Sequence, residues 1–353
     1  HNMTTLWQRY QDLKAEQAYL FQYDAARQLG VSEGELLASA PDSIYLGSDF
    51  VGIFNRLQAI QQVQLVVRNQ CAVHEKITHI TPLKLNEKVG LATDVGGFDV
   101  RLFPQKWAHA FAHDFVTHGK TMRSIQFYGA HGFALQKVYL HSSEDDALWQ
   151  AIVNDFKQAN KPQILPQHQP TSAPIIALSR DDAAEFQERW RNLGNIHHFF
   201  GLLEEFKLSR KQAFEAAPRG YAFKVDNSCV EKTYEAAAAA EVPLITFVGN
   251  HGIIQIQTGT VKHISRQRGW LNIFDQKHNG FTMHIDDSKI KSTWLLLRPT
   301  RDGIVSCLEC LDAFGHTVLT VFGQRTEGQA ELAAWRDVLQ VATGKTVQDE
   351  VMA

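Results

Sequence analysis

The second half of the chain repeats the first at a spacing of about 180 residues, and this repeat constrains the fold more than any other feature of the sequence. Tyr128-Gly-Ala-His-Gly132 corresponds to Leu311-Asp-Ala-Phe-Gly315. Each copy ends in a helical pattern with a tryptophan, Trp149 in the first and Trp335 in the second. We therefore predict two tandem structural repeats.

The order of elements within each copy indicates an α+β fold. One helix is predicted over residues 6–30, and the capping box Ser32-x-x-Glu35 begins a second helix that ends before Pro41. The second copy has the same layout, with a helix from Phe186 to Phe206 and then Ser209-x-x-Gln212. Short runs rich in Val, Ile, Phe and Thr follow without intervening helices, which favours antiparallel meanders. Each repeat is therefore predicted as a broad antiparallel sheet with N-terminal helices and a closing C-terminal helix.

A proline-rich segment separates the two copies. Residues 158–175 hold four of the ten prolines, and proline continues neither a helix nor a central strand. We predict a first repeat over residues 3–157, a linker over 158–175 and a second repeat over 176–345. Residues 1–2 precede Met3 and are interpreted as an expression remnant.

Composition disfavours several classes of function. A net charge of -3 and a pI near 6.6 give no field that would steer the protein to nucleic acid or an anionic membrane. There is no run of about 18 apolar residues and no basic segment followed by an apolar one at the start. We expect a cytoplasmic protein without membrane insertion and without a nucleic-acid partner.

The four cysteines do not form a disulfide framework in a chain of this size. Cys307-x-x-Cys310 has the spacing of a metal or redox motif, but Ile304 to Leu311 is predicted as a strand. Residues three apart in a strand face opposite sides. We therefore expect the two thiols not to share a metal ion.

A helix from Phe186 to Phe206 would direct a histidine toward the core. At about 100° per residue, His197 falls on the apolar face with Trp190. Gly194 and Gly201, about one turn on either side, leave room for a neighbouring helix or a flat ligand. The simpler interpretation is a core histidine that hydrogen-bonds a carbonyl group.

The two copies differ at positions that can carry chemistry. His197 aligns with Gln17 or Leu20, depending on where the gap is placed, so the first copy lacks this imidazole. Conversely, the first copy has Arg101 where the second has His284. Arg101 can serve a ligand, or it can be an exposed strand residue paired with a neighbouring acid.

Further candidates are one histidine and three arginines. His74 aligns with Gln255 and by itself is interpreted as a surface histidine beside Glu75. Single arginines stand near the ends of elements in the second copy, where a guanidinium suits a carboxylate, although each alone resembles a surface charge. These arginines are Arg210, Arg298 and Arg325.

Five motifs together resemble a known family, the HemS-type haem-utilisation proteins of the bacterial cytoplasm, also called hemin-degrading factors. The resemblance spans nearly the whole chain, including the doubling, and the motifs occur in the family's order. They are Ile196-His-His-Phe-Phe-Gly-Leu-Leu203, Phe247-Val-Gly-Asn-His-Gly-Ile-Ile-Gln-Ile-Gln-Thr-Gly259, Trp270-Leu-Asn272, Trp294-Leu-Leu-Leu-Arg-Pro-Thr-Arg-Asp-Gly303 and Phe322-Gly-x-Arg325.

The resemblance implies one haem, iron protoporphyrin, in a cleft between the sheets and a helix of the second half. It implies that His197 is the proximal iron ligand, that Arg101 is the distal residue and that Phe103 lines the pocket. The other implied contacts are the propionate-binding cations Arg210, Arg298 and Arg325, the aromatic Phe247, and His74 for a second haem in some members.

The chain departs from the family pattern in three places. Arg298 replaces the usual lysine, which keeps the charge but changes its reach. Gln257 stands where a histidine is usual, and the first-half motif reads Cys-Ala-Val-His at residues 71–74 instead of Cys-Val-His. The transfer of a haem site to His74 is the one most affected.

The expected function is a haem-binding protein that receives imported haem and either transfers it or degrades it to release iron. The alternative is a haem carrier or storage protein without catalytic activity, and a non-haem binding module would require the five motifs to be coincidental. In a degrading enzyme Arg101 is the candidate catalytic residue. No flavin or nicotinamide motif occurs, so electrons would come from outside. A haem-uptake transporter or a haem oxygenase is the expected donor or recipient.

Overall fold

The computed structural model describes residues 5–86, 90–92 and 98–351. The chain forms two compact units that are not consecutive in sequence. Residues 68–74 group with the second unit and residues 250–254 with the first. The ranges are 1–67, 75–169 and 250–254 for unit 1, and 68–74, 170–249 and 255–353 for unit 2. Residues 157–179 hold no helix or strand, as predicted for the proline-rich segment.

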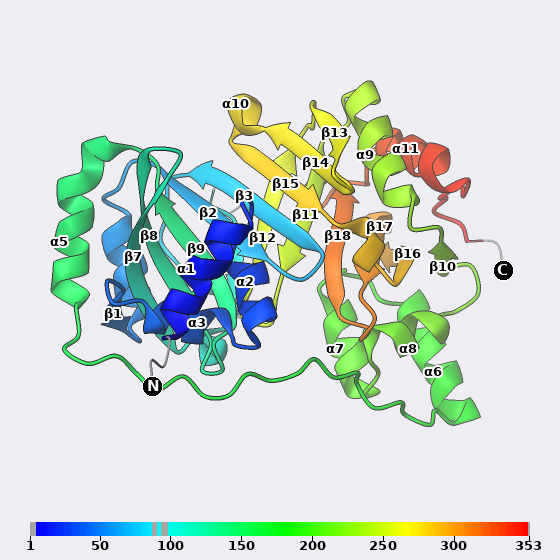
Figure 1. Cartoon of the computed structure of the whole chain (residues 1–353). Coiled ribbons are helices and arrows are strands. Elements are labelled where there is room, and N and C mark those ends of the chain that lie inside the picture. Colours follow the sequence, from blue (N-terminus) through cyan, green and yellow to red (C-terminus); the bar gives the residue numbers. More distant parts are fainter. Residues whose placement is uncertain (1–4, 87–89, 93–97, 352–353) are drawn as a thin grey trace. The chain divides into compact units, whose positions relative to one another are not determined.

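The first half of the chain begins with short helices and continues mainly as strands (Figure 1). In unit 1 the antiparallel order is β1-β7-β8-β9-β2, and β4-β5-β6 is a second meander. The elements are α1 (Leu6–Glu16), α2 (Gln22–Leu29), α3 (Glu33–Ser39), β1 (Ile44–Gly47), α4 (Phe50–Leu57), β2 (Val63–Arg68), β3 (Ala72–Thr78), β4 (Lys84–Asn86), β5 (Gly90–Ala92), β6 (Val100–Leu102), η1 (Pro104–Lys106), β7 (His109–Thr117), β8 (Lys120–Tyr128), β9 (Ala134–Leu140), η2 (Ser143–Asp145) and α5 (Asp146–Phe156).

The second half repeats this order of elements. In unit 2 the antiparallel order is β10-β16-β17-β18-β11, and β13-β14-β15 is a second meander. The elements are α6 (Arg180–Arg191), α7 (His198–Glu205), α8 (Arg210–Glu215), β10 (Ala222–Val225), α9 (Cys229–Ala240), β11 (Leu244–Gly249), β12 (Ile253–Gly259), β13 (Ile264–Gln267), β14 (Trp270–Asp275), α10 (Gln276–Asn279), β15 (Phe281–Ile285), η3 (Asp287–Lys289), β16 (Ser292–Thr300), β17 (Gly303–Leu311), β18 (Thr317–Gly323) and α11 (Ala333–Thr343). The predicted α+β class with two tandem repeats is confirmed.

The N-terminal helices are shorter than predicted. The helix predicted over residues 6–30 is two helices, because Gln17 leaves α1 in an extended conformation and α2 begins only after Phe21. The break allows Tyr10 of α1 and Ala26 of α2 to be buried in one apolar cluster. The capping box at Ser32 is confirmed: its side chain accepts from the Glu35 N–H, and α3 ends at Ser39.

Three α-helices that lie between strands were not predicted from the sequence. They are α4, between β1 and β2, α9, between β10 and β11, and the four-residue α10, between β14 and β15. Phe54 of α4 is buried with Trp149 of the closing helix α5, and in unit 2 Tyr234 of α9 is buried with Trp335 of α11. The closing helix of each half therefore shares its sheet face with a second helix. The prediction of strands without intervening helices is wrong at α4, α9 and α10.

Strand β17 directs side chains to both apolar faces of the unit 2 sheet. Cys307 packs into the cluster under α6, α7 and α8, whereas Cys310 packs into the cluster under α9 and α11. Figure 1 shows these two helix groups on opposite sides of β16, β17 and β18. The prediction that the two thiols face opposite sides is confirmed. Burial raises the pKa of each thiol to about 12, which keeps both protonated at neutral pH.

Each unit has a buried ion pair between a helix and its sheet, and the two pairs have opposite polarity. Glu33 and Arg210 are the first residues of the equivalent helices α3 and α8, each of which begins after a serine N-cap. In unit 1 the helix residue Glu33 pairs with Lys137 of β9 at 2.6 Å. In unit 2 the helix residue Arg210 pairs with Glu309 of β17 at 2.5 Å. The helix contributes the acid in one unit and the base in the other.

The structure also supports a stability prediction for Gly132, which has a left-handed φ of 82°. A Cβ built there would lie 1.9 Å from Ser32 Oγ, whereas at the equivalent Gly315 (φ 84°) the nearest atom is the Lys211 Cβ at 3.8 Å. We expect Gly132→Ala to lower the free energy of unfolding by about 3 kcal/mol, because backbone strain and a steric clash add, against about 1 kcal/mol for Gly315→Ala. Urea titrations of both variants measure this difference. Equal losses would show that Ser32 moves away freely.

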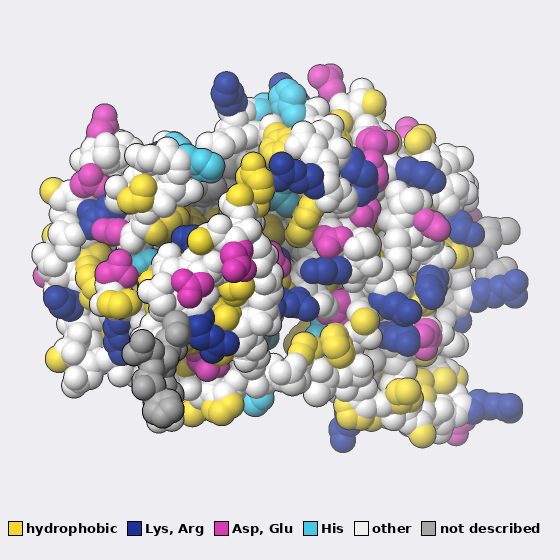
Figure 2. Space-filling view, in the orientation of Figure 1, with side chains coloured by type: hydrophobic (Ala, Val, Ile, Leu, Met, Phe, Trp, Pro, Cys, Tyr) yellow, Lys and Arg dark blue, Asp and Glu magenta, His cyan; other side chains and the backbone are white. Residues whose placement is uncertain are grey.

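Charges on the surface are mixed in sign. On the face drawn in Figure 2, the side chains of Lys and Arg are interspersed with those of Asp and Glu. This distribution agrees with the near balance of 35 basic and 38 acidic residues. Within the residues that the structure describes, no helix is both long enough and apolar enough to cross a membrane.

Candidate functional site

His197 lies in a turn between two helices. α6 ends at Arg191 and α7 begins at His198, so the continuous helix predicted from Phe186 to Phe206 does not form. Gly194 has a φ of 77°, a left-handed conformation that glycine adopts without strain and that ends a helix. His197 is the N-cap residue of α7, and its side chain is exposed. The prediction that His197 faces the apolar core is therefore wrong.

Hydrogen bonds to the end of β16 hold this turn in place. The Gly194 N–H donates to the Pro299 carbonyl at 3.0 Å, and the Arg301 N–H donates to the Gly194 carbonyl at 3.0 Å. Within the turn, the Asn195 side chain accepts from the His197 N–H at 2.9 Å. These bonds satisfy backbone groups at the broken helix that would otherwise lack partners. They also connect the histidine turn to the turn that follows β16.

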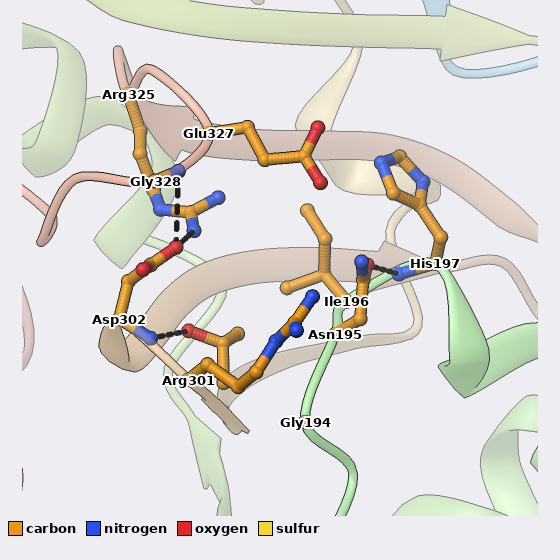
Figure 3. A pocket seen from close by; sticks show the side chains of 10 residues that line it. Gly194, Asn195, Ile196, His197, Arg301, Asp302, Arg325, Glu327 and Gly328 are labelled. Carbon is orange, nitrogen blue, oxygen red and sulfur yellow. Dashed lines mark hydrogen bonds and ion pairs between the residues drawn. The ribbon is translucent and has the colours of Figure 1, made fainter.

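His197 lines a cavity of about 330 Å³ within unit 2, near the lower limit for a ligand site. The side chains of His197, Arg301 and Glu327 extend into it from three different segments (Figure 3). The complete lining is Gly194, Asn195, Ile196, His197, Thr300, Arg301, Asp302, Arg325, Glu327 and Gly328. A cavity of this size can accept one edge of a large flat ligand but cannot enclose it.

Two arginines share one buried carboxylate on the sheet face that α6, α7 and α8 cover. Glu309 accepts from Arg210 Nε at 2.5 Å and Nη2 at 2.9 Å, from Arg298 Nη2 at 3.4 Å, and from the Thr317 hydroxyl at 2.9 Å. Burial by itself would raise the pKa of Glu309, but Arg210 and Arg298 hold it below its ordinary value. With two guanidinium groups and one carboxylate, the cluster carries a net positive charge.

The uncompensated charge of this cluster lies mainly on Arg298. Its side chain is 7% exposed, and in the part of the chain that the structure describes its Nε has no hydrogen-bond partner. The guanidinium lies 4.3 Å from the centre of the Phe199 ring, which offsets part of the desolvation. Burying an unbalanced charge is unfavourable, so the cluster would be stabilised by an anion. Arg210, 29% exposed, is the side chain through which an anion can reach it.

The other residues predicted in the second half also lie in unit 2. Arg325 lines the cavity, where it donates to the Asp302 carboxylate at 2.7 Å and to the Gln329 carbonyl at 3.0 Å. Phe247 of β11 is partly buried against the cluster under α6, α7 and α8, with its ring centre 5.5 Å from that of Phe322. The predicted residues of unit 2 therefore form two groups, one around the cavity and one on the helix-covered sheet face.

Arg101 and Phe103 lie in unit 1. Arg101 of β6 donates to the buried Asp99 carboxylate at 2.8 Å, so it has the acidic partner that the alternative interpretation proposed. Burial raises the pKa of Asp99, and Arg101 only partly opposes this effect. Phe103 follows β6, is partly buried, and donates its N–H to the Gly252 carbonyl at 3.0 Å.

His74 is fully buried on β3, so its interpretation as a surface histidine is wrong. Gln255, which corresponds to His74 in the repeat, also touches it in the structure, with Nε2 3.0 Å from the His74 Nδ1. The Phe281 ring packs 5.0 Å away, centre to centre. Burial prevents an external ligand from reaching this imidazole unless its surroundings move. A haem site at His74 stays a prediction.

Three charged residues of the site were not predicted from the sequence. Glu309 could have been noticed because it is a lone acid within an apolar strand. Arg301 could have been noticed because it is a second arginine close after Arg298. Glu327 had no such signal. By the helix bounds, the N-cap position of His197 corresponds in the first half to Phe21, the residue next to Leu20.

Comparisons with known proteins cover nearly the whole chain. A sequence profile described as the Haemin-degrading HemS.ChuX domain matches residues 30–156 and again 207–341. The hemin transport protein HemS of Yersinia enterocolitica is 33% identical over 347 residues, which are 97% of this chain and 99% of that protein.

Two solved structures are similar along the same length. Holo-PhuS, a heme-binding protein from Pseudomonas aeruginosa, has a TM-score of 0.87 at 33% identity, covering 95% of this chain and 97% of that one. The Escherichia coli O157:H7 heme degrading enzyme ChuS has a TM-score of 0.86 at 32% identity, with the same coverage. Because the profile matches twice and the relatives align over their full length, the chain belongs to the haemin-degrading HemS/ChuX family.

Proposed function

We propose that the protein binds haem and serves bacterial haem utilisation, either by transferring imported haem or by degrading it to release iron. The observation that carries the proposal is that the buried Arg298 and the partly exposed Arg210 share the single buried carboxylate of Glu309. The net positive charge of this cluster would be stabilised by an anion that lies beside an apolar surface. The exposed imidazole of His197 belongs to the same unit.

The residues fit haem, a flat apolar disc with an iron at its centre and two carboxylates at its edge. When bound, haem supplies an iron with open coordination positions and the redox chemistry of that iron. His197 would donate a ring nitrogen to the iron. Arg210, Arg298 and Arg325 would pair with the carboxylates. Among the residues that the structure describes, no atom beyond the local backbone of α7 and the chain neighbours of Gly201 lies within 4 Å of a Cβ built at Gly201, so the space beside this position is open.

The remaining predicted residues have proposed roles as well. Phe247 would contact the porphyrin, since it borders the helix-covered face of the unit 2 sheet. Arg101, with Phe103 beside it, is proposed as the distal residue, where its guanidinium would donate hydrogen bonds to a ligand of the iron. Its partner Asp99 would hold the guanidinium in one orientation. The proposed second site at His74 would require its buried surroundings to open.

The relatives include a hemin transport protein and a heme degrading enzyme, so both roles stay open for this chain. A carrier without catalytic activity is the second candidate. For either role we propose a cytoplasmic location, and a haem-uptake transporter or a haem oxygenase as donor or recipient. A titration with hemin, followed at the Soret band, tests the common part of the proposal. A protein that leaves the hemin spectrum unchanged would disprove it.

Arg101→Ala separates the carrier from the enzyme. We expect the hemin complex, mixed with ascorbate in air, to lose its Soret band through ring-opened products. The variant should change the rate or the product much more than the hemin affinity, because a guanidinium that stabilises developing charge acts mainly on the reaction. Absorption spectra and chromatography of the pigments give the readout.

Catalase is the control in this experiment, because free peroxide bleaches hemin without an enzyme. Degradation that disappears when catalase is added, or that proceeds identically in Arg101→Ala, would leave the carrier as the supported function.

A further inference from the structure

Arg301 is the arginine of the His197 cavity whose charge no acid balances. Among residues 5–86, 90–92 and 98–351, no acceptor pairs with its side chain, which is exposed. Arg325, in the same cavity, is already held by the Asp302 carboxylate and the Gln329 carbonyl. A new anion in the cavity would therefore meet Arg301 without having to displace an existing partner.

The backbone places Arg301 together with His197. The Arg301 N–H donates to the Gly194 carbonyl, and a β-bridge joins Gly194 to Thr300. Next to Arg301, the Asp302 N–H donates to the Thr300 hydroxyl at 3.0 Å. The guanidinium and the imidazole thus project from two turns that are bonded to each other, which suits a single ligand that touches both.

Glu327 supplies the opposite charge in this cavity. Its carboxylate extends into the cavity on the side toward His197, whereas Arg301 enters from the other side (Figure 3). The described part of the chain contains no hydrogen-bonding or ion-pair partner for it. The cavity therefore has a positive charge on one side, from Arg301, and a negative charge on the other, from Glu327, and neither side chain forms an ion pair within the described residues.

We propose that Arg301 binds a carboxylate of the haem and that Glu327 repels carboxylates, so that the two residues determine which edge of the porphyrin enters this cavity. The inference rests on the proposed haem binding and adds a specificity-determining pair to it. A guanidinium matches a carboxylate through two parallel hydrogen bonds. Glu327 makes the reverse in-plane orientation unfavourable, because it would place two carboxylates together.

The test compares Arg301→Ala and Glu327→Gln with the parent protein, using hemin and its uncharged dimethyl ester. Exposed charge pairs are modest, so Arg301→Ala should weaken hemin binding about three- to tenfold, and Glu327→Gln should strengthen it by a similar factor. Neither variant should change the affinity for the ester. Arg219→Ala, which removes an exposed arginine outside the cavity lining, is the matched control and should have no effect.

The orientation of the porphyrin in the complex can be measured separately from the affinity. Proton NMR of the ferric cyanide complex resolves the methyl groups of the porphyrin, and their pattern depends on how the ring is turned above the axial imidazole. Both cavity variants should change that pattern, and Arg219→Ala should not. Equal losses of hemin and ester affinity in Arg301→Ala, or an unchanged methyl pattern in both cavity variants, would overturn the inference. A parent protein that does not bind hemin would instead disprove the proposed function.

Discussion

Replacing His197 with alanine is expected to abolish or shift the Soret band of the hemin complex, the largest spectroscopic effect of any single substitution in this chain. The imidazole is the proposed iron ligand, and no other residue of the cavity lining offers a neutral ring nitrogen that could replace it. Because His197 is exposed at the start of α7, its removal should leave the fold intact. Circular dichroism before hemin is added checks that point.

His198→Ala is the matched control. His198 is also exposed, but it lies one residue farther along α7 and its Nδ1 is 3.2 Å from the Leu193 carbonyl, outside the cavity lining. We expect its hemin spectrum to resemble that of the parent protein. Equal changes in the two variants would contradict the assignment of His197 as the iron ligand.

Glu309→Gln is expected to destabilise unit 2 by about 3–5 kcal/mol, the loss typical when one partner of a buried ion pair is removed. The variant leaves the guanidinium groups of Arg210 and Arg298 without a compensating carboxylate. Chemical denaturation followed by tryptophan fluorescence gives the free energy of unfolding. Glu235→Gln, at an exposed site on α9, should change it by less than about 0.5 kcal/mol.

The same carboxylate predicts how stability depends on pH. The pKa of Glu309 in the folded protein lies below its ordinary value of 4.5. Its contribution is therefore complete above pH 4.5, and it is lost as the pH falls through the lower folded-state value. Stability measured across this acidic range should fall more steeply in the parent protein than in Glu309→Gln. Parallel curves would mean that Glu309 is not the group responsible.

The sequence predicted the parts of the fold that depend on local patterns. The capping box at Ser32 and the opposite faces of Cys307 and Cys310 follow from neighbouring residues, and the structure has both. The interruption at Gly194 could not be read from helical periodicity, because the broken helix is stabilised by hydrogen bonds to Pro299 and Arg301, more than 100 residues away.

The three arginines of the second half were predicted without their acidic partners. The sequence indicates that Arg210, Arg298 and Arg325 suit carboxylates, but it does not show which acids lie beside them. The structure pairs the first two with Glu309 and the third with Asp302. Partner choice depends on how strands and loops pack, and this information is not contained in the local spacing of arginines.

The opposite polarity of the two helix-to-sheet ion pairs has a consequence for how a duplicated chain assembles. Lys137 lies on β9 opposite Gln126 of β8, and Glu309 lies on β17 opposite Thr320 of β18, so the two charges occupy opposite members of equivalent cross-strand pairs. If α8 were placed on the sheet of unit 1, Arg210 would lie over the pair that contains Lys137, and if α3 were placed on the sheet of unit 2, Glu33 would lie over the pair that contains Glu309. Each misplacement buries two like charges, which is strongly unfavourable in an apolar setting. The charges thus disfavour packing of the helix of one half on the sheet of the other, although the two halves have similar shapes. During folding they favour the pairing of each helix with the sheet of its own half.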